Sequence, residues 1–345
     1  MQKSATQLTS ARALGALVAL LIAVSLPLGA GAAEPVKVTL QSQANEAGFP
    51  LWLAQRLGYF KDAGLDVKIQ YFANGGAALA SGASGEWQAG WTGSPPSITG
   101  WAKFGLIPVG TMMKEDRNIK LVMRKDALAG SNPAEVLKTK PIGTVPNSTW
   151  SQVLYACAKH FNVDPKAMKI VPLDPPVTRQ SLRSGQVASG TTDSSPDYDL
   201  VNDKANFEVV CDGAIGKTSV IDPYIVTPRF AKDDPAAAAR FVDAAYKANE
   251  FIRKNQEQAV KYLLEYYKDA GIDGTEAKAR YTLGQRDFQT LDEALADMKD
   301  GTTEKTLRAT AEVFVAGGSY DKVPDLASAV KAGLPILEAA RALRK

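Results

Sequence analysis

Histidine and cysteine, the residue types most often found at metal and nucleophilic sites, are almost missing from this chain. Its 345 residues include one histidine, His160, and two cysteines, Cys157 and Cys211. A metal site of clustered histidines is therefore excluded, and a serine–histidine pair would have to use His160 alone. We expect His160 at a helix end or on the surface. The sequence predicts no metal site, no cofactor and no catalytic residue.

Short catalytic and nucleotide-binding motifs are also missing. The chain contains no G-x-S-x-G, H-E-x-x-H, G-x-x-x-x-G-K or G-x-G-x-x-G. Four aspartates lie close together at Asp193, Asp197, Asp199 and Asp203, but their spacing is wrong for a calcium loop and Pro196 interrupts it. A turn followed by a helix explains them better.

The N-terminus carries an apolar run that is too short to span a membrane. A basic segment with Lys3 and Arg12 precedes an aliphatic stretch over residues 14–26, and small residues follow at 30–32. This order is typical of a cleaved signal peptide, predicted here over residues 1–33. A spanning helix needs about 20 apolar residues, and neither an arginine pair nor a nearby cysteine indicates twin-arginine export or a lipid anchor. The sequence therefore predicts a freely diffusing periplasmic protein.

Neither sign of charge is in excess once this segment is set aside. The chain has 40 basic and 37 acidic residues, a formal charge of +3. Removal of residues 1–33 takes away two basic residues and no acid, which leaves 38 against 37 and a charge of +1. A nucleic-acid surface would need clustered lysine and arginine, so no nucleic-acid partner is expected. The remaining length of about 310 residues favours two lobes over one core.

Strand-like and helix-like segments alternate along this remaining part. That pattern predicts an α/β protein with mostly parallel sheets flanked by helices, and the chain after Pro235 is almost all helical. A strand-like return segment over residues 219–227 predicts two hinge crossings between two lobes. Residues 34–124 and 223–345 are expected to form lobe one, and residues 125–222 lobe two. A cleft between α/β lobes is a common place for a ligand.

The two cysteines fall in the same predicted lobe and, after export, in an oxidising compartment. A disulfide between Cys157 and Cys211 is one interpretation. Cys157 also lies at helical spacing from Val153, Leu154 and Phe161, a pattern typical of a buried thiol. Both interpretations stay open at this stage.

Loops of small and polar residues precede three predicted helices, at residues 74–76, 92–94 and 147–149. Residues 149–152 fit a capping box. Helix N-termini carry unpaired N–H groups and the positive end of the helix dipole, so several of them facing one cleft would form an anion site. The alternative for any one loop is that it only caps its own helix. Trp150 could cover an apolar part of a ligand.

Several segments resemble a known family. Residues 48–54 (Gly-Phe-Pro-Leu-Trp-Leu-Ala) and 57–67 (Leu-Gly-Tyr-Phe-Lys-Asp-Ala-Gly-Leu-Asp-Val) are similar to the opening signature of ABC-importer substrate-binding proteins of the aliphatic sulfonate, taurine and nitrate class. Residues 72–76 and 85–96 resemble the next two blocks of that family. Residues 230–235 resemble its helix entry after the return crossing.

This resemblance implies a two-lobed type II periplasmic binding fold and a small anionic or zwitterionic organic solute in the cleft. It also implies an ABC permease and ATPase at the inner membrane as partners, and we expect a monomer that is not an enzyme. The expected ligand-binding residues, from the matched positions and the loops, are Gln41, Ser42, Asn45, Phe49, Gly75, Gly76, Thr92, Gly93, Ser94, Ser148, Thr149, Trp150 and Asp193.

One departure from the family concerns the charge of the solute. Many sulfonate binders carry a tryptophan before a proline in lobe two, whereas residues 190–197 (Gly-Thr-Thr-Asp-Ser-Ser-Pro-Asp) have no aromatic residue. Asp193 would repel an anion or pair with an amino or hydroxyl group, which favours a zwitterion such as taurine or another small nitrogen compound.

Two alternative functions remain. One is an enzyme of the same fold related to thiamine-pyrimidine synthesis, although the cysteine cluster and reactive histidine of those enzymes have no matched counterparts here. The other is a periplasmic sensor subunit that reports ligand occupancy to a membrane kinase.

Overall fold

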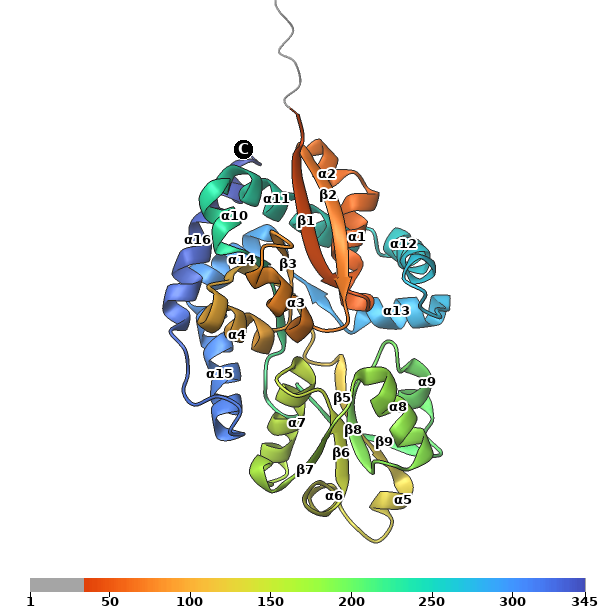
Figure 1. Cartoon of the computed structure of the whole chain (residues 1–345). Helices are drawn as coiled ribbons and strands as arrows, with labels where there is room; N and C mark the ends of the chain where they lie inside the picture. The colour runs from red at the N-terminus through yellow and green to blue at the C-terminus, as the bar shows by residue number, and fades with distance from the viewer. Residues whose placement is uncertain (1–33, 345) are drawn as a thin grey trace, which may run out of the picture. The chain divides into compact units, whose positions relative to one another are not determined.

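The computed structural model describes residues 34–344, which form two β-sheets, each flanked by helices (Figure 1). We call the part built on the first sheet lobe one and the part built on the second sheet lobe two. The first sheet has the order β11-β4-β10-β3-β1-β2, with strands β1 (Val36–Gln43), β2 (Leu65–Phe72), β3 (Ala89–Trp91), β4 (Ile107–Lys114), β10 (Ile221–Val226) and β11 (Asp287–Phe288). The second has the order β7-β6-β8-β5-β9, with β5 (Ile119–Arg124), β6 (Pro141–Thr144), β7 (Lys169–Pro172), β8 (Ser189–Asp193) and β9 (Phe207–Asp212).

Both sheets are mixed, which corrects the expectation of mostly parallel strands. Strand β1 runs parallel to β2 and β3, and β6 runs parallel to β7 and β8. In contrast, β10 is antiparallel to β3 and β4, and β5 is antiparallel to β8 and β9. The antiparallel strands β5 and β10 are those that receive the chain as it arrives from the other lobe.

The crossings occur at residues 115–118 and 213–220, so the expected boundary at residue 124 is too late. Strand β5 lies inside the second sheet, paired with β8 on one side and β9 on the other. Its buried residues Leu121 and Met123 belong to the core of lobe two. At the return, β10 begins at Ile221 and belongs wholly to the first sheet.

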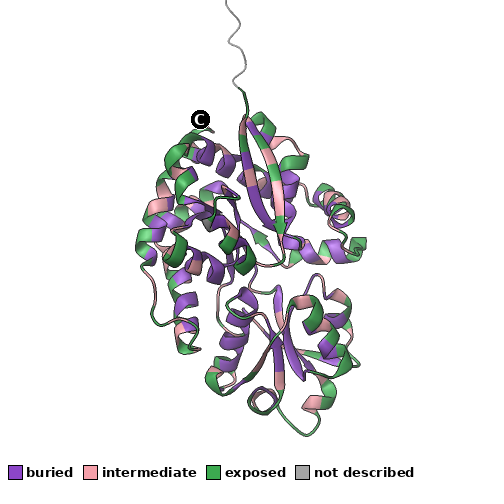
Figure 2. Ribbon diagram, in the orientation of Figure 1, coloured by how far each residue is buried: buried purple, intermediate pink, exposed green. Residues whose placement is uncertain are grey.

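Helices cover the sheets and bury one face each, as the purple faces in Figure 2 show. Asp234 begins the long helix α11 by accepting a hydrogen bond from Ala237 N at 2.8 Å, and Pro235 occupies the first turn. In lobe one the helices are α1 (Phe49–Arg56), α2 (Tyr59–Asp62), α3 (Gly75–Ala83), α4 (Ser94–Phe104), α10 (Pro228–Asp233), α11 (Pro235–Lys254), α12 (Gln256–Asp269), α13 (Glu276–Gly284), α14 (Leu291–Lys299), α15 (Thr302–Ala316) and α16 (Leu326–Ala342). In lobe two they are α5 (Lys125–Leu128), α6 (Pro133–Thr139), α7 (Thr149–His160), α8 (Pro175–Ser184) and α9 (Tyr198–Asn202).

Helix α15 joins the two cores. It packs against α4 of lobe one and α7 of lobe two. Phe314 on α15 is fully buried in the core of lobe two, where its ring meets Tyr155 edge-on at 5.7 Å between centroids. The C-terminal helices therefore do not serve lobe one alone.

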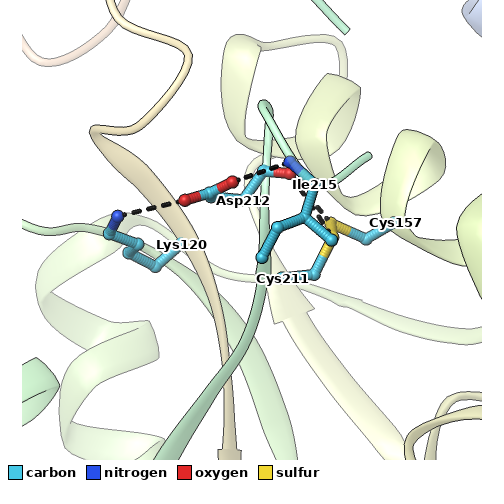
Figure 3. Close-up of a disulfide and its surroundings, with 5 residues drawn as sticks. All are labelled: Lys120, Cys157, Cys211, Asp212 and Ile215. Carbon is cyan, nitrogen blue, oxygen red and sulfur yellow. Dashed lines mark hydrogen bonds and ion pairs between the residues drawn. A yellow bond between two sulfur atoms is a disulfide. The ribbon is translucent and has the colours of Figure 1, made fainter. Parts of the chain in front are cut away.

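The two cysteines form a disulfide that ties α7 to the edge strand β9 (Figure 3). The Cα atoms of Cys157 and Cys211 lie 6.0 Å apart, and both residues are fully buried. Next to the disulfide, Asp212 pairs with Lys120 at 3.3 Å and accepts a hydrogen bond from Ile215 N at 2.9 Å. Of the two interpretations of the cysteines, the disulfide is the one observed.

The predicted signal peptide, residues 1–33, lies outside the described residues. Within the described range, no helix combines the length and the apolar character that crossing a membrane requires.

Candidate functional site

A cavity of about 230 Å³ lies between the lobes and is lined from both sides. Lobe one contributes loops after β1, β2 and β3, and the side chains of Trp91 and Asp222. Lobe two contributes the loop from Val145 to Trp150 and Asp193 at the end of β8. Glu115, on the first crossing, completes the wall.

Eight of the residues expected to bind ligand line this cavity. They come from the loop after β1, two helix-entry loops of lobe one, one of lobe two, and the end of β8: Asn45, Gly75, Gly76, Gly93, Ser148, Thr149, Trp150 and Asp193. The structure thus brings together segments more than 140 residues apart in sequence, as the two-lobe interpretation requires.

Asparagine and serine caps fix the loops that carry these residues. Asn74 begins α3 by accepting a hydrogen bond from Ala77 N at 3.0 Å. Ser148 begins α7, and its side chain and that of Ser151 accept hydrogen bonds from each other's backbone N–H groups. The capping box therefore starts at Ser148, one residue before the expected Thr149, because Ser148 has the extended backbone conformation that an N-cap requires.

The other five expected residues do not line the cavity: Gln41, Ser42, Phe49, Thr92 and Ser94. Two of them, Gln41 and Ser42, lie behind the wall and hold it. The side-chain amide of Gln41 donates to the carbonyl oxygen of Trp91, and the indole N–H of Trp91 donates to Ser42 Oγ at 3.0 Å. These two contacts fix the orientation of a tryptophan that does line the cavity.

The remaining three residues, Phe49, Thr92 and Ser94, do not contact Trp91 through hydrogen bonds. Phe49 is 1% exposed and packs in the lobe-one core against Trp52, with 6.1 Å between ring centroids. Thr92 is buried next to Gly75, where a Cβ atom on the glycine would lie 2.5 Å from Thr92 Oγ1. Ser94 Oγ donates to Gln152 Oε1 at 3.2 Å, which makes it a contact between the lobes.

Two acidic residues of the cavity wall, Glu115 and Asp222, were missed. Glu115 follows β4 directly, and Asp222 is the second residue of β10. Both are nearly inaccessible, with 5% and 1% exposure. The sequence does contain a sign of Asp222: it is the one acid in an otherwise apolar strand, Ile-Asp-Pro-Tyr-Ile-Val over residues 221–226. Aspartate is almost never fully buried unless it has a partner.

Arg286, also missed, links the lobes at the cavity. It follows α13, and its side chain is fully buried. It donates a hydrogen bond to Ser195 Oγ at 2.8 Å, and its terminal nitrogen lies 3.3 Å from Asp193 Oδ1. Its Nε lies 3.3 Å from Glu115 Oε2. Because Asp193 and Ser195 belong to lobe two, one guanidinium spans the gap and compensates two carboxylates.

The wall is acidic even after this compensation. Among the residues that line the cavity, three are acids, Glu115, Asp193 and Asp222, and within the described chain none of the lining residues is a lysine or arginine. Burial raises the pKa of Asp222 to about 7, and Arg286 opposes that increase. Burial and then the charge of Asp222 raise the pKa of Glu115 well above its ordinary value.

The two carboxyls lie close enough to influence each other's pKa. When both are ionised, neither oxygen of Asp222 has a hydrogen-bond donor among the described residues. The cavity wall therefore contains two buried carboxyls, of which Asp222 has unused acceptor capacity.

Metal or nucleophilic chemistry has little support in this geometry. Over residues 34–344, no group of three or more histidine, cysteine, aspartate or glutamate side chains is arranged to hold a metal ion. His160 is exposed at the end of α7 and is not part of the cavity wall. The aspartate-rich stretch forms a turn and the short helix α9, as expected.

Comparison with known proteins agrees with this architecture. The model of the NMT1/THI5-like family matches residues 45–259. The alkanesulfonate-binding protein SsuA from Xanthomonas axonopodis pv. citri, bound to MOPS, is similar in structure with a TM-score of 0.69 and 17% identity, over 87% of this chain and 98% of that one. The periplasmic nitrate-binding protein NrtA from Synechocystis PCC 6803 has a TM-score of 0.72 and 13% identity, over 90% and 89%.

The periplasmic aliphatic sulphonate-binding protein SsuA from Escherichia coli is a third similar structure, with a TM-score of 0.65 and 18% identity, over 85% of this chain and 91% of that one. These likenesses show the type II periplasmic binding fold. A search of curated proteins found no match.

Proposed function

Because the chain belongs to the NMT1/THI5-like family, we propose that it is the substrate-binding subunit of an ABC importer. In this role it captures a small organic solute between its lobes and delivers the solute to a permease driven by an ATPase. The observation that carries the proposal is the cavity, which takes its wall from both lobes and from the N-terminal loops of helices α3, α4 and α7. Such a wall is complete only when the lobes are together.

The size of the cavity supports a small solute. Its volume is about 230 Å³. Drug-sized ligands occupy pockets of about 300–1,000 Å³. The solute is therefore a compact molecule of a few non-hydrogen atoms, such as a short amino acid or amino sulfonate.

The charge of the wall distinguishes between the two solute types expected from the sequence. Three carboxyls line the cavity, and the nearby Arg286 is committed to Asp193, Ser195 and Glu115. A simple anion would meet these carboxyls without a free cation to balance them. We therefore favour a zwitterion over an anion of the sulfonate or nitrate type.

The cellular part of the proposal follows from the same role. We propose that residues 1–33 direct export, that the mature chain is a periplasmic monomer, and that its partners are a permease and an ATPase at the inner membrane. A sensor subunit would use the same cavity, and capture of the membrane partner in a pull-down would separate a permease from a kinase.

An enzyme related to thiamine-pyrimidine synthesis remains the second candidate, since the family description includes THI5. The reactive groups that such an enzyme would need are placed unfavourably. Cys157 and Cys211 are consumed in the disulfide, and His160 is exposed outside the cavity.

Binding can be tested on the purified mature chain, residues 34–345, in a thermal-shift screen. The panel contains sulfonates, amino sulfonates, nitrate, carboxylates, amino acids and pyrimidines. A ligand at 100 times its Kd adds about 2.7 kcal/mol to the free energy of unfolding, a shift that the assay resolves. Small-angle scattering should then show a smaller radius of gyration with the ligand, because closure brings the lobes together. Absence of any stabilising compound would contradict the proposal, and turnover of a bound compound would favour the enzyme.

A further inference from the structure

The carboxyl of Asp222 in the cavity wall is costly to the empty protein. Asp222 is 1% exposed, and its two oxygens lack a hydrogen-bond donor among the described residues when Asp222 and Glu115 are ionised. A buried charge without a partner is strongly unfavourable. Asp222 also lies beside the cavity loop of lobe one, since a Cβ atom on Gly93 would lie 3.5 Å from Asp222 Oδ1. The unused acceptors are therefore at the place where a ligand would lie.

A second unpartnered group lines the same cavity from the other lobe. Trp150 is 8% exposed, and its indole N–H has no acceptor within the described part of the chain. It is the second residue of α7, whose first backbone N–H groups also face no acceptor inside the helix. Lobe one thus offers acceptors that lack donors, and lobe two offers, beside Asp193, a donor that lacks an acceptor and the positive end of a helix.

Aromatic side chains from both lobes also line the cavity. Trp91 and Trp150 both line the cavity, and the hydrogen bond from Trp91 to Ser42 holds its ring in place. The face of a tryptophan ring attracts a cation through its quadrupole. Tryptophans near carboxylates therefore favour a positively charged group over a negative one.

We propose that the cavity binds a protonated amine, whose N–H groups donate to Asp222 and Glu115, with an acceptor group of the same molecule directed to Trp150 and the start of α7. This inference rests on the proposed solute-binding function and adds the chemical class of the solute. A carboxylate, sulfonate or hydroxyl oxygen would serve as the acceptor end.

Other classes of ligand would leave the oxygens of Asp222 without donors or bring a negative charge to the carboxyls. A quaternary ammonium ion has no N–H and would leave the oxygens of Asp222 without donors. An inorganic anion would meet the carboxyls, while Arg286 is already bound to Asp193, Ser195 and Glu115. An amine is the group that supplies both positive charge and several donors.

The experiment uses matched pairs of compounds that differ in the amino group. Taurine is compared with ethanesulfonate, β-alanine with propionate, and putrescine with butane-1,4-diol, by titration calorimetry on the mature chain at pH 8. We expect at least one amine to bind, with an affinity at least about tenfold above that of its partner without nitrogen, the loss expected for one charged hydrogen bond. Binding of the nitrogen-free partners with equal or greater affinity would overturn the inference and leave the solute-binding function intact. Absence of binding across the panel would overturn both.

A pair of variants identifies the carboxyl involved. Asp222→Asn should weaken amine binding about tenfold or more. The matched control is Asp197→Asn, which removes another acid that is 2% exposed but does not line the cavity, and it should change the affinity less than about threefold. Circular dichroism and the Tm of each variant verify the fold. Equal affinities of Asp222→Asn and the wild type, with both folded, would refute the assignment.

Discussion

The empty protein should become more stable at neutral and alkaline pH when Asp222 is replaced by asparagine. Burial raises the pKa of Asp222 from its ordinary 3.8 to about 7, so the native state binds this proton more tightly than the unfolded state does. Between pH 4 and 7 the native state therefore carries more protons, and the free energy of unfolding falls as the pH rises. Asparagine has a similar shape but no charge to bury, and it removes this penalty.

The magnitude follows from the size of the pKa change. The increase of about 3 pKa units, at about 1.36 kcal/mol for each, sets an upper value of about 4 kcal/mol for the stabilisation above pH 7. An asparagine amide would in addition offer N–H donors to the neighbouring Glu115 carboxylate. For a chain of this size, where about 1 kcal/mol corresponds to roughly 2 °C, the Tm should rise by up to about 8 °C.

Differential scanning calorimetry of the ligand-free mature chain from pH 5 to pH 8 measures the effect. The Tm difference between Asp222→Asn and the wild type should be small at pH 5 and grow toward pH 8. Asp66→Asn is the control for the change in net charge, because Asp66 is exposed on β2, and its difference from the wild type should not depend on pH in this way. Parallel curves of wild type and Asp222→Asn would refute the claim that Asp222 is a buried acid without sufficient compensation.

Three further predictions concern the disulfide, the lobe contact and the buried arginine. Replacement of Cys157 and Cys211 by alanine should lower the free energy of unfolding by up to about 4 kcal/mol in urea melts, because the bond closes a 54-residue separation. Gly93→Ala should weaken ligand binding, because its Cβ would lie 2.8 Å from Thr149 Cγ2 across the cleft. Thr149→Ser removes Cγ2, so adding it to Gly93→Ala should restore binding. Failure of this rescue would argue against a steric cause. Arg286→Gln should lower the free energy of unfolding by about 3–5 kcal/mol in urea melts, with little recovery in Arg286→Lys, because an ammonium cannot reproduce the fork geometry of the guanidinium.

Local patterns were sufficient to predict much of the fold. The alternation of strands and helices, the Asp234 cap with Pro235, and the glycine and proline residues at segment ends are short-range signals, and each corresponds to an observed element boundary. The mixed sheets and the late boundary at residue 124 have a common origin. Strand β5 finds its partners β8 and β9 more than 60 residues later, and local sequence does not contain that pairing.

Some residues of the candidate site could also be predicted from local sequence, and others could not. Loops before helices are recognisable from small residues and caps, so Gly75, Gly93 and Ser148 were identified, and all three line the cavity. Arg286 was not, because its partners Asp193 and Ser195 are 93 and 91 residues away and a single arginine after a helix resembles ordinary surface charge. Gln41 and Phe49 were both expected to contact the ligand, whereas Gln41 holds Trp91 from behind and Phe49 packs in the core of lobe one.

Glu115 and Asp222, the two acids that the sequence did not predict, lie near the two crossings between the lobes. Glu115 directly follows β4, where the chain leaves lobe one, and Asp222 lies in β10, where it returns; Asp193 faces them from lobe two. Burial raises the pKa of Asp222, Arg286 lowers it, and the charge of Asp193 raises it by less than Arg286 lowers it. A protonated amine between the lobes would place a further positive charge among carboxyls that come from both of them. Because a ligand shifts a conformational equilibrium only through its different affinity for the two states, this charge arrangement gives an amine a direct energetic reason to favour the closed lobes.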